Sequence, residues 1–247
     1  MQTLRAELHV HTVLSPCAEV EMIPPLIVQE ALEHGITLIA ITDHNASANI
    51  AAVQTAAQGT ALNVLPGMEL QTQEEVHVLC LFETLTTLLA WQTIVDQHMP
   101  DLKNDPDLFG EQFVVDPTGD FIRREERLLL TSSTITIDHA FEQVHAMGGL
   151  VIPAHVDRKA FGLLANLGFV SPSWPVEVLE LSRHLPPAEA AQRYPQLAGY
   201  QFIQSGDVHR LDEFLGANEF TIASPTLAEL RLAFHSQAGR NYRHTRR

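Results

Sequence analysis

The sequence predicts an α/β fold in one domain, with the functional groups gathered at one edge of a largely parallel sheet. Short apolar runs alternate with stretches whose apolar residues recur at helical spacing, which is the pattern of successive βαβ units. Several of these runs end in His, Asp or Glu. The chain has 247 residues, 45% of them hydrophobic, which is enough for one barrel-sized core. We therefore expect a single domain over residues 1–247.

The first part of the chain shows the alternation clearly. An apolar run from Leu4 to His11 predicts the first strand. Pro24 then opens a helix that Gly35 closes, because proline suits a helix start and glycine a helix end. Ile36–Thr42 is apolar almost without interruption, as expected of a strand covered on both faces. This strand runs directly into Asp43, His44 and Asn45.

Two further strands and a long irregular segment follow. We expect a helix over Ala48–Gln58, a strand from Leu62 that continues to Leu70, and another strand over Glu75–Phe82. From about Thr84 to Leu130 the regularity is lost after a helix near Leu88–His98. Long connections in compact domains are usually functional or mobile, so we expect this segment to be an excursion from the barrel, or a lid over the site.

The alternation resumes in the last part of the chain. The expected elements are a helix over Ile137–Met147 and strands at Leu150–Ile152, Glu177–Ser182 and Gln201–Gln204. Thr221–Ala223 and a helix over about Leu227–His235 then finish the fold. Seven core strands with polar groups at their C-terminal ends describe a barrel whose active site lies on that face. The basic segment Arg240–Arg247 is expected to be a solvated tail, with anion binding as the alternative.

The pair His9 and His11 indicates metal binding. Side chains at i and i+2 of a strand point to the same face, so both imidazoles can hold one ion. In a chain with 13 histidines, an isolated pair of this kind is more often two half-exposed strand residues. The recurrence of His, Asp or Glu at later strand ends favours the metal site.

Eight candidate metal ligands share a position at or beside a strand end. They are His9, His11, His44, Glu69, His77, His155, Asp207 and His209. Imidazole suits Zn, Fe and Mn, and carboxylates can bridge two cations. Because a single catalytic zinc has three protein ligands, eight candidates predict two or three divalent ions. Asp43, next to His44, is expected to accept a hydrogen bond behind the ligands.

Arg158, three residues after His155, is expected to clamp a phosphate group in bidentate fashion. The alternative is a surface arginine paired to an acidic neighbour. Arg183 and Arg210 are further candidates for phosphate binding. Two close cations lower the pKa of a bridging water, so that hydroxide attacks phosphorus, and Asp43 or His155 is then the candidate to deliver a proton to the leaving oxygen.

The ordered motifs resemble those of the PHP family, named for polymerases and histidinol phosphatases. They are His9-Val10-His11, Ile41-Thr42-Asp43-His44-Asn45, Pro66-Gly67-Met68-Glu69, Glu75-Val76-His77, Pro153-Ala154-His155 and Asp207-Val208-His209, and the resemblance covers about residues 3–225. It implies a distorted (β/α)7 barrel with a trinuclear metal centre at the C-terminal ends of the strands. It also implies ligand roles for the eight residues and the hydrolysis of phosphoesters.

The sequence departs from the family pattern after the first motif. Many members place an Asp or His there that also binds metal, whereas this chain has Ser15–Glu19. Cys17 is then either a thiolate ligand, which favours Zn or Fe, or an unligated thiol near Glu19 or Glu21. The number of bound ions, two or three, therefore stays open.

The resemblance implies a small phosphorylated substrate. A nucleotide, such as a nucleoside 3′,5′-bisphosphate or the end of a short oligonucleotide, comes first. The alternatives are histidinol phosphate and a metal-binding module without turnover. The net charge of −15 predicts no binding to duplex nucleic acid or to an anionic membrane. Two cysteines and the absence of a signal or membrane-spanning sequence predict a cytoplasmic protein, and the oligomeric state stays open.

Overall fold

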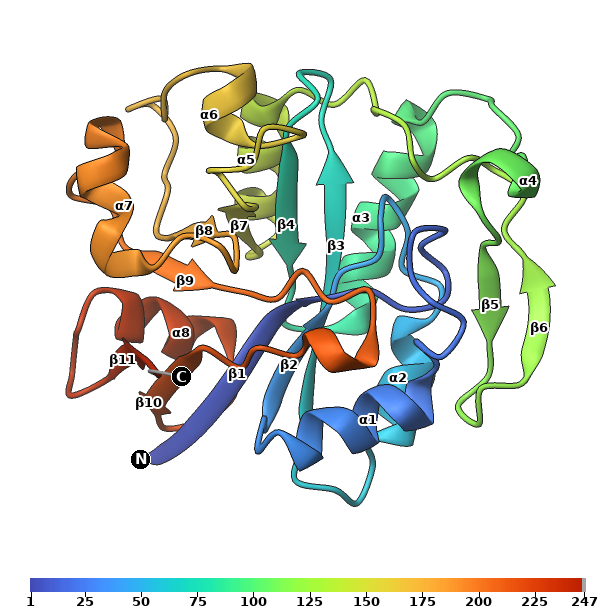
Figure 1. The fold of residues 1–247 in the computed structure, drawn as a ribbon, viewed down its shortest axis with the longest axis horizontal. Coiled ribbons are helices and arrows are strands. Elements are labelled where there is room, and N and C mark those ends of the chain that lie inside the picture. The colour runs from blue at the N-terminus through green and yellow to red at the C-terminus, as the bar shows by residue number, and fades with distance from the viewer. Residues whose placement is uncertain (246–247) are drawn as a thin grey trace.

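The computed structural model describes residues 1–245 and shows a curled seven-stranded sheet with helices packed around it (Figure 1). From one edge to the other, the strands are β11 (Asn241–His244), β10 (Asn218–Ile222), β1 (Gln2–Val10), β2 (Leu38–Ile41), β3 (Asn63–Gln71), β4 (His77–Leu81) and β7 (Leu150–Pro153). A separate parallel pair, β8 (Leu179–Leu181) and β9 (Phe202–Gln204), follows β7 in the chain. The predicted α/β class is confirmed, and the curled sheet is the distorted barrel that the sequence predicts.

The helices that the sequence predicts are present, with shifted ends: α1 (Pro24–Glu33), α2 (Ile50–Ala56), α3 (Leu85–His98), α5 (Ile137–Ala146) and α8 (Leu227–Phe234). The structure adds the helices α4 (Pro106–Phe109), α6 (Leu163–Asn166) and α7 (Pro187–Arg193) and the 3-10 helices η1 (Pro195–Leu197) and η2 (Leu211–Glu213). All four residues of β2 are fully buried. Ile39 and Ile41 pack in one core cluster and Leu38 and Ala40 in another, so β2 is covered on both faces as predicted.

The sheet is mixed, whereas the sequence predicts a largely parallel one. β1, β2 and β3 run parallel, but β4 is antiparallel to β3 and to β7. The physical reason is the short link between Gln71 and His77, because a parallel crossover needs about a dozen residues or more. β4 therefore begins at the edge where β3 ends. His77, the first residue of β4, thus reaches the same edge as the C-terminal ends of its neighbours.

The excursion at residues 84–130 is more ordered than the sequence predicts. Beyond α3 and α4 it forms a hairpin of β5 (Phe113–Val115) and β6 (Phe121–Arg124), seen at the right of Figure 1. Asn49 Nδ2 donates to the carbonyl of Phe113 at 2.9 Å, and Asn45 Nδ2 donates to the carbonyl of Leu129 at 2.8 Å. The segment that follows β2 therefore holds the excursion in place, and its role as a lid stays a prediction.

The basic C-terminal segment is part of the fold, so the prediction of a solvated tail is wrong for residues 241–244. They form β11, which pairs with β10 at the edge of the sheet. The ring of Tyr242 stacks on Phe220, with 5.5 Å between centroids, and its hydroxyl accepts from the backbone N–H of Phe202 at 3.2 Å. Arg246 and Arg247, the end of that prediction, lie outside the described residues. Among the described helices, none is both long enough and apolar enough to cross a membrane.

Candidate metal centre

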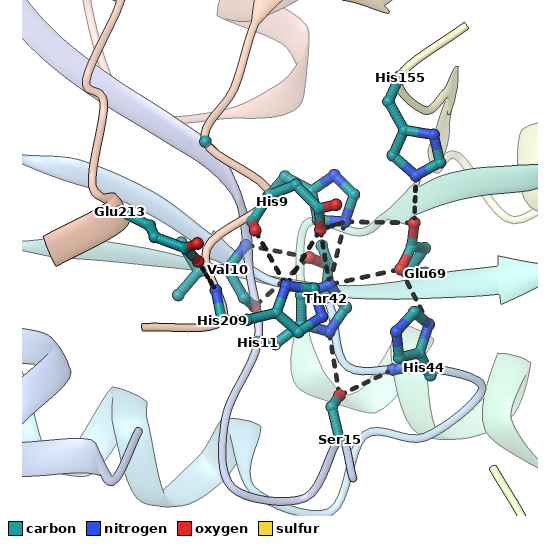
Figure 2. A network of polar contacts seen from close by, with 12 residues as sticks. His9, Val10, His11, Ser15, Thr42, His44, Glu69, His155, His209 and Glu213 are labelled. Carbon is teal, nitrogen blue, oxygen red and sulfur yellow. Dashed lines mark hydrogen bonds and ion pairs between the residues drawn. The ribbon is translucent and has the colours of Figure 1, made fainter. Parts of the chain in front are cut away.

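The eight predicted ligands come together at the edge where β1, β2, β3 and β7 end and β4 begins. Figure 2 labels His9, His11, His44, Glu69, His155 and His209 among them. His9 and His11 follow the alternation of β1, and their Nε2 atoms lie 3.1 Å apart in the fully buried centre of the cluster. Both lone pairs therefore point to the same small volume.

The carboxylate of Glu69 lies between five imidazoles. Its Oε1 is 2.8 Å from Nδ1 of His77, 3.1 Å from Nε2 of His155 and 3.3 Å from Nε2 of His9, and its Oε2 is 2.9 Å from Nδ1 of His44 and 3.3 Å from Nε2 of His11. The two oxygens thus face different sets of nitrogens. Glu69 would therefore supply one oxygen to each of two ligand sets if the centre held two cations.

A second pair of ligands faces the first across a parallel bridge. Val10 lies between His9 and His11, and Val208 lies between Asp207 and His209. The two valines form an isolated parallel β-bridge. The backbone N–H of Val208 donates to the carbonyl of His9 at 3.0 Å, and the N–H of His11 donates to the carbonyl of Val208 at 2.9 Å. This bridge brings Asp207 Oδ1 to 3.2 Å from Nε2 of His9 and stacks the ring of His209 on that of His11.

Three overlapping groups of ligand atoms have the spacing of metal sites, with the atoms of each group within 4.8 Å of one another. Among the described residues they are His11, His44 and His209; His9, His11, Glu69 and Asp207; and His44, Glu69 and His77. In the described part of the chain, His77 Nε2 and His155 Nδ1 are buried without a hydrogen-bond partner. An unpaired buried polar atom costs about 1–3 kcal/mol, so bound cations would satisfy a donor set that is otherwise unfavourable. The residues present therefore fit divalent transition metals.

The charge states of four ligands suit metal binding. Although burial alone would lower the pKa of His9 and of His11, the neighbouring carboxylates raise it, so each ring must lose a proton when a cation binds. Burial alone would raise the pKa of Glu69, but the histidines around it hold that pKa well below its ordinary value. The pKa of Asp207 is lowered in the same way, chiefly by the charge of His9. Burial lowers the pKa of His44 to about 4 and that of His209 to about 3. Both rings are therefore neutral at physiological pH and have a free lone pair, as a metal ligand must.

Asp43 lies behind the ligands, as the sequence predicts. Its carboxylate accepts from the backbone N–H of Thr12 at 2.7 Å, from the Thr12 hydroxyl at 2.8 Å and from the Ser15 hydroxyl at 2.7 Å. Ser15 Oγ also lies 3.0 Å from Nδ1 of His11. Asp43 therefore orients a ligand through Ser15. It is fully buried and is not among the residues that line the cavities at the centre, so this position does not support proton delivery to a substrate.

Glu180 of β8 is a site residue that the sequence reasoning missed. Its buried Oε1 lies 2.9 Å from Nδ1 of His9 and accepts from the backbone N–H of His155 at 3.0 Å. A metal ligand commonly donates its second ring nitrogen to a carboxylate in this way, which fixes the tautomer and the ring orientation. The available signal was one acid inside an apolar strand, in the run Val178-Leu179-Glu180-Leu181.

Glu7 is a second buried acid that the sequence reasoning passed over. It lies on the same strand as His9, two residues earlier, and accepts from the backbone N–H groups of Gly206, Leu215 and Gly216 at 2.9–3.0 Å. Gly206 directly precedes Asp207. Glu7 therefore anchors the loop that carries the C-terminal ligands.

The three predicted phosphate-binding arginines line one cavity of about 380 Å³ that opens onto Asp207 and His209. Arg158 forms an ion pair with Asp207, which is the alternative that the sequence left open. Arg183 donates to the carbonyls of Gly206 and Glu213. Arg210 pairs with Glu19 at 3.0 Å. Phosphate binding by these residues stays a prediction.

Cys17 is exposed and lines the same cavity, but it belongs to none of the three ligand groups found among the described residues. A second cavity, of about 250 Å³, lies beside the first. It shares Cys17, Arg158, Asp207 and His209 with it and has Phe161 and Leu130 as its apolar walls. The metal centre is thus open to solvent on two sides.

Comparison with known proteins places this geometry in a family. The family model described as PHP domain matches residues 7–164. The chain is 32% identical over 96 residues to the 5′-3′ exoribonuclease Rnm of Escherichia coli (strain K12), a match that spans 37% of this chain and 32% of that protein.

Solved structures share the fold over almost the whole chain. A lesion-specific endonuclease, PfuEndoQ from Pyrococcus furiosus, superposes with a TM-score of 0.76 at 17% identity, covering 98% of this chain and 58% of that one. Endonuclease Q in complex with a 27-mer duplex substrate that has an abasic lesion at the active site superposes with a TM-score of 0.74 at 16% identity, covering 97% and 58%. The chain thus spans little more than half the length of these proteins.

The complex of Endonuclease Q with a duplex corrects one expectation. The exclusion of duplex nucleic acid, drawn from the net charge, is wrong, because the fold itself accommodates a duplex in Endonuclease Q. Net charge averages over the whole surface, whereas binding depends on the field at the site. Bound cations and three arginines at one mouth can reverse that field locally.

Proposed function

Since the chain belongs to the PHP domain family and is a metal-dependent phosphoester hydrolase, we propose that its substrate is a nucleotide phosphoester. The substrate is a nucleoside 3′,5′-bisphosphate or the end of a short oligonucleotide. One observation carries the proposal: Asp207 and His209, which belong to two of the overlapping ligand groups, line the same cavity as Arg158, Arg183 and Arg210. The resemblance to an exoribonuclease over 96 residues supports a nucleotide as the substrate.

We propose that two or three divalent ions of Zn, Mn or Fe occupy the centre. The residues that would hold them are His9, His11, His44, Glu69, His77, His155, Asp207 and His209, with Cys17 as an additional candidate. When bound, such ions acidify a water for attack on phosphorus and stabilise the oxygens of the displacement.

The side chains of the protein supply positioning. The Arg158 guanidinium is about two-fifths exposed and reaches Asp207 at the cavity mouth, so it can exchange this partner for a substrate phosphate with little loss of burial. Arg183 is occupied by two backbone carbonyls and holds the loop. His155 directs Nε2 at Glu69, which favours a ligand role over that of a proton donor.

The proposal is tested by metal analysis of the purified protein, followed by assays with Mn, Zn and Fe. The substrates are a nucleoside 3′,5′-bisphosphate, a 5′-phosphorylated short RNA, a short duplex and histidinol phosphate. We expect two or three bound metals and turnover of at least one of the first three. Bound metal without any turnover would show a binding module, and preference for histidinol phosphate would show the alternative enzyme.

A further inference from the structure

The two cavities at the metal centre differ in chemical character. The larger one is lined by Arg158, Arg183 and Arg210 and suits an anion. The smaller one has the side chains of Phe161 and Leu130 in its wall beside the ligands His44 and His77. A molecule that lies across the metals would therefore meet a basic region on one side and an apolar region on the other.

Phe161 is held rigidly at the mouth of the smaller cavity. Its ring lies parallel to the imidazole of His77, with 4.5 Å between centroids and 3° between planes. Its carbonyl accepts from the backbone N–H of His77 at 3.0 Å, which fastens the turn to the start of β4. The ring is packed on a ligand through one face, and the residue is still 37% exposed.

The backbone of this turn is strained in a way that fixes the ring. Phe161 has φ +57°, a left-handed conformation that is costly for a bulky residue. At Gly162, a Cβ would collide with the carbonyl oxygen of Arg158. The turn therefore closes tightly between Arg158, which lines both cavities, and Phe161, which lines the smaller one.

We propose, on the basis of the nucleotide phosphoesterase function, that Phe161 is the platform on which the nucleobase of the substrate stacks. An aromatic ring with one face already packed presents a flat apolar surface at little entropic cost, which suits the π-face of any base. The phosphate then lies toward Arg158 in the larger cavity and the base toward Phe161 in the smaller one. The turn from Arg158 to Gly162 thus fixes the spacing between base and phosphate recognition.

The proposal predicts that recognition depends on the base as well as the phosphate. The test compares adenosine 3′,5′-bisphosphate with the matched compound that lacks the base, ribose bearing the same two phosphates. In the wild type we expect a lower KM for the nucleotide. Phe161→Ala should raise the KM for the nucleotide roughly 10-fold or more, the usual effect of removing a stacking partner. The kcat for the nucleotide, and the KM and kcat for the compound without a base, should change little.

Two variants provide controls. Phe161→Tyr keeps the ring and should retain the wild-type KM. Phe169→Ala removes a more exposed phenylalanine from the same segment, outside both cavities, and should also behave as wild type. Metal content is measured for each variant, because the ring also packs on His77.

Equal losses on both compounds, with lower metal content, would show that Phe161 only supports His77 and would overturn the proposal. Unchanged kinetics on the nucleotide would overturn it as well. A wild type that turns over neither compound overturns the nucleotide function instead. In that case equilibrium binding of AMP and of ribose 5-phosphate to the metal-loaded protein still tests Phe161, and equal affinity for both refutes stacking.

Discussion

The ligands from the two halves of the chain are held in different ways. His9, Glu69 and His77 lie on strands of the main sheet, where the backbone ladder fixes them. His155 and Asp207 lie just beyond strands, at φ +29° and +50°. These loop ligands depend on buried carboxylates, because Glu180 accepts from the N–H of His155 and Glu7 from the N–H beside Asp207.

The difference teaches where the site is rigid and where it needs support. Each non-glycine residue in a left-handed conformation costs about 1–3 kcal/mol unless its surroundings impose it. In the C-terminal half, Glu7, Glu180 and Arg183 impose it. We therefore call the strand ligands His9, Glu69 and His77 the preformed half of the centre, and the loop ligands His155 and Asp207 its braced half.

Loss of one ligand from either half should have the largest effect. His9→Ala removes a strand ligand and Asp207→Ala a loop ligand, and each should lower phosphoesterase activity by more than the about 100-fold typical of altered outer-shell partners. Metal content should fall in parallel, as measured by elemental analysis. Circular dichroism should show the fold retained in both, and full activity in either variant would refute the ligand assignment.

Removal of the metals should distinguish the two halves. Ions present at about 100 times their Kd contribute about 3 kcal/mol of stability, so a chelator should lower the melting temperature. Hydrogen exchange should show the loss locally: amides at 154–158 and 205–209 should exchange faster, while those within β1 to β3 stay protected. Uniform deprotection of the sheet would contradict the distinction between a preformed and a braced half.

Glu180 joins the halves, and its substitution should have an intermediate effect. Glu180→Gln keeps the size of the side chain but removes the charge beside Nδ1 of His9. We expect metal affinity to fall about 10- to 100-fold, measured by competition with a chromogenic chelator. Glu177→Gln is the matched control, since Glu177 pairs with Arg231 and His235 away from the centre. Equal behaviour of the two variants would remove Glu180 from the site.

The smallest effect is expected from Arg183. Arg183→Ala removes hydrogen bonds to the carbonyls of Gly206 and Glu213, which should destabilise the fold by about 1–3 kcal/mol in urea unfolding. A structural brace predicts no change in KM for the substrate. A large rise in KM at unchanged stability would instead establish the phosphate-binding role that the sequence suggests.

The alternation of apolar runs was sufficient to predict the α/β class and which residues gather at one edge. Such runs report burial but not direction, so the reversed orientation of β4 was missed. The short link from Gln71 to His77 already contained that information. The basic composition of residues 240–247 suggested a tail, although Tyr242 supplies the apolar contact that β11 needs.

The supporting residues were harder to predict than the ligands. Glu7 shares the face of His9 and His11 by the same i, i+2 rule, and Glu180 is a lone acid in an apolar strand, so both had a sequence signal. Their partners are backbone amides from distant loops, which no local pattern specifies. The same holds for Arg158 and Arg183, whose acceptors depend on how the loops close.

The bridge between Val10 and Val208 makes the centre a late product of biosynthesis. It joins residues that roughly 200 positions separate, and contacts of such long range form slowly. At the usual rate of translation the first histidine pair leaves the ribosome about 10 to 40 s before its partners. During that interval His9 and His11 belong to an unfinished chain with an incomplete coordination shell. The metal centre can therefore close only after all the residues from His9 to His209 have been synthesised.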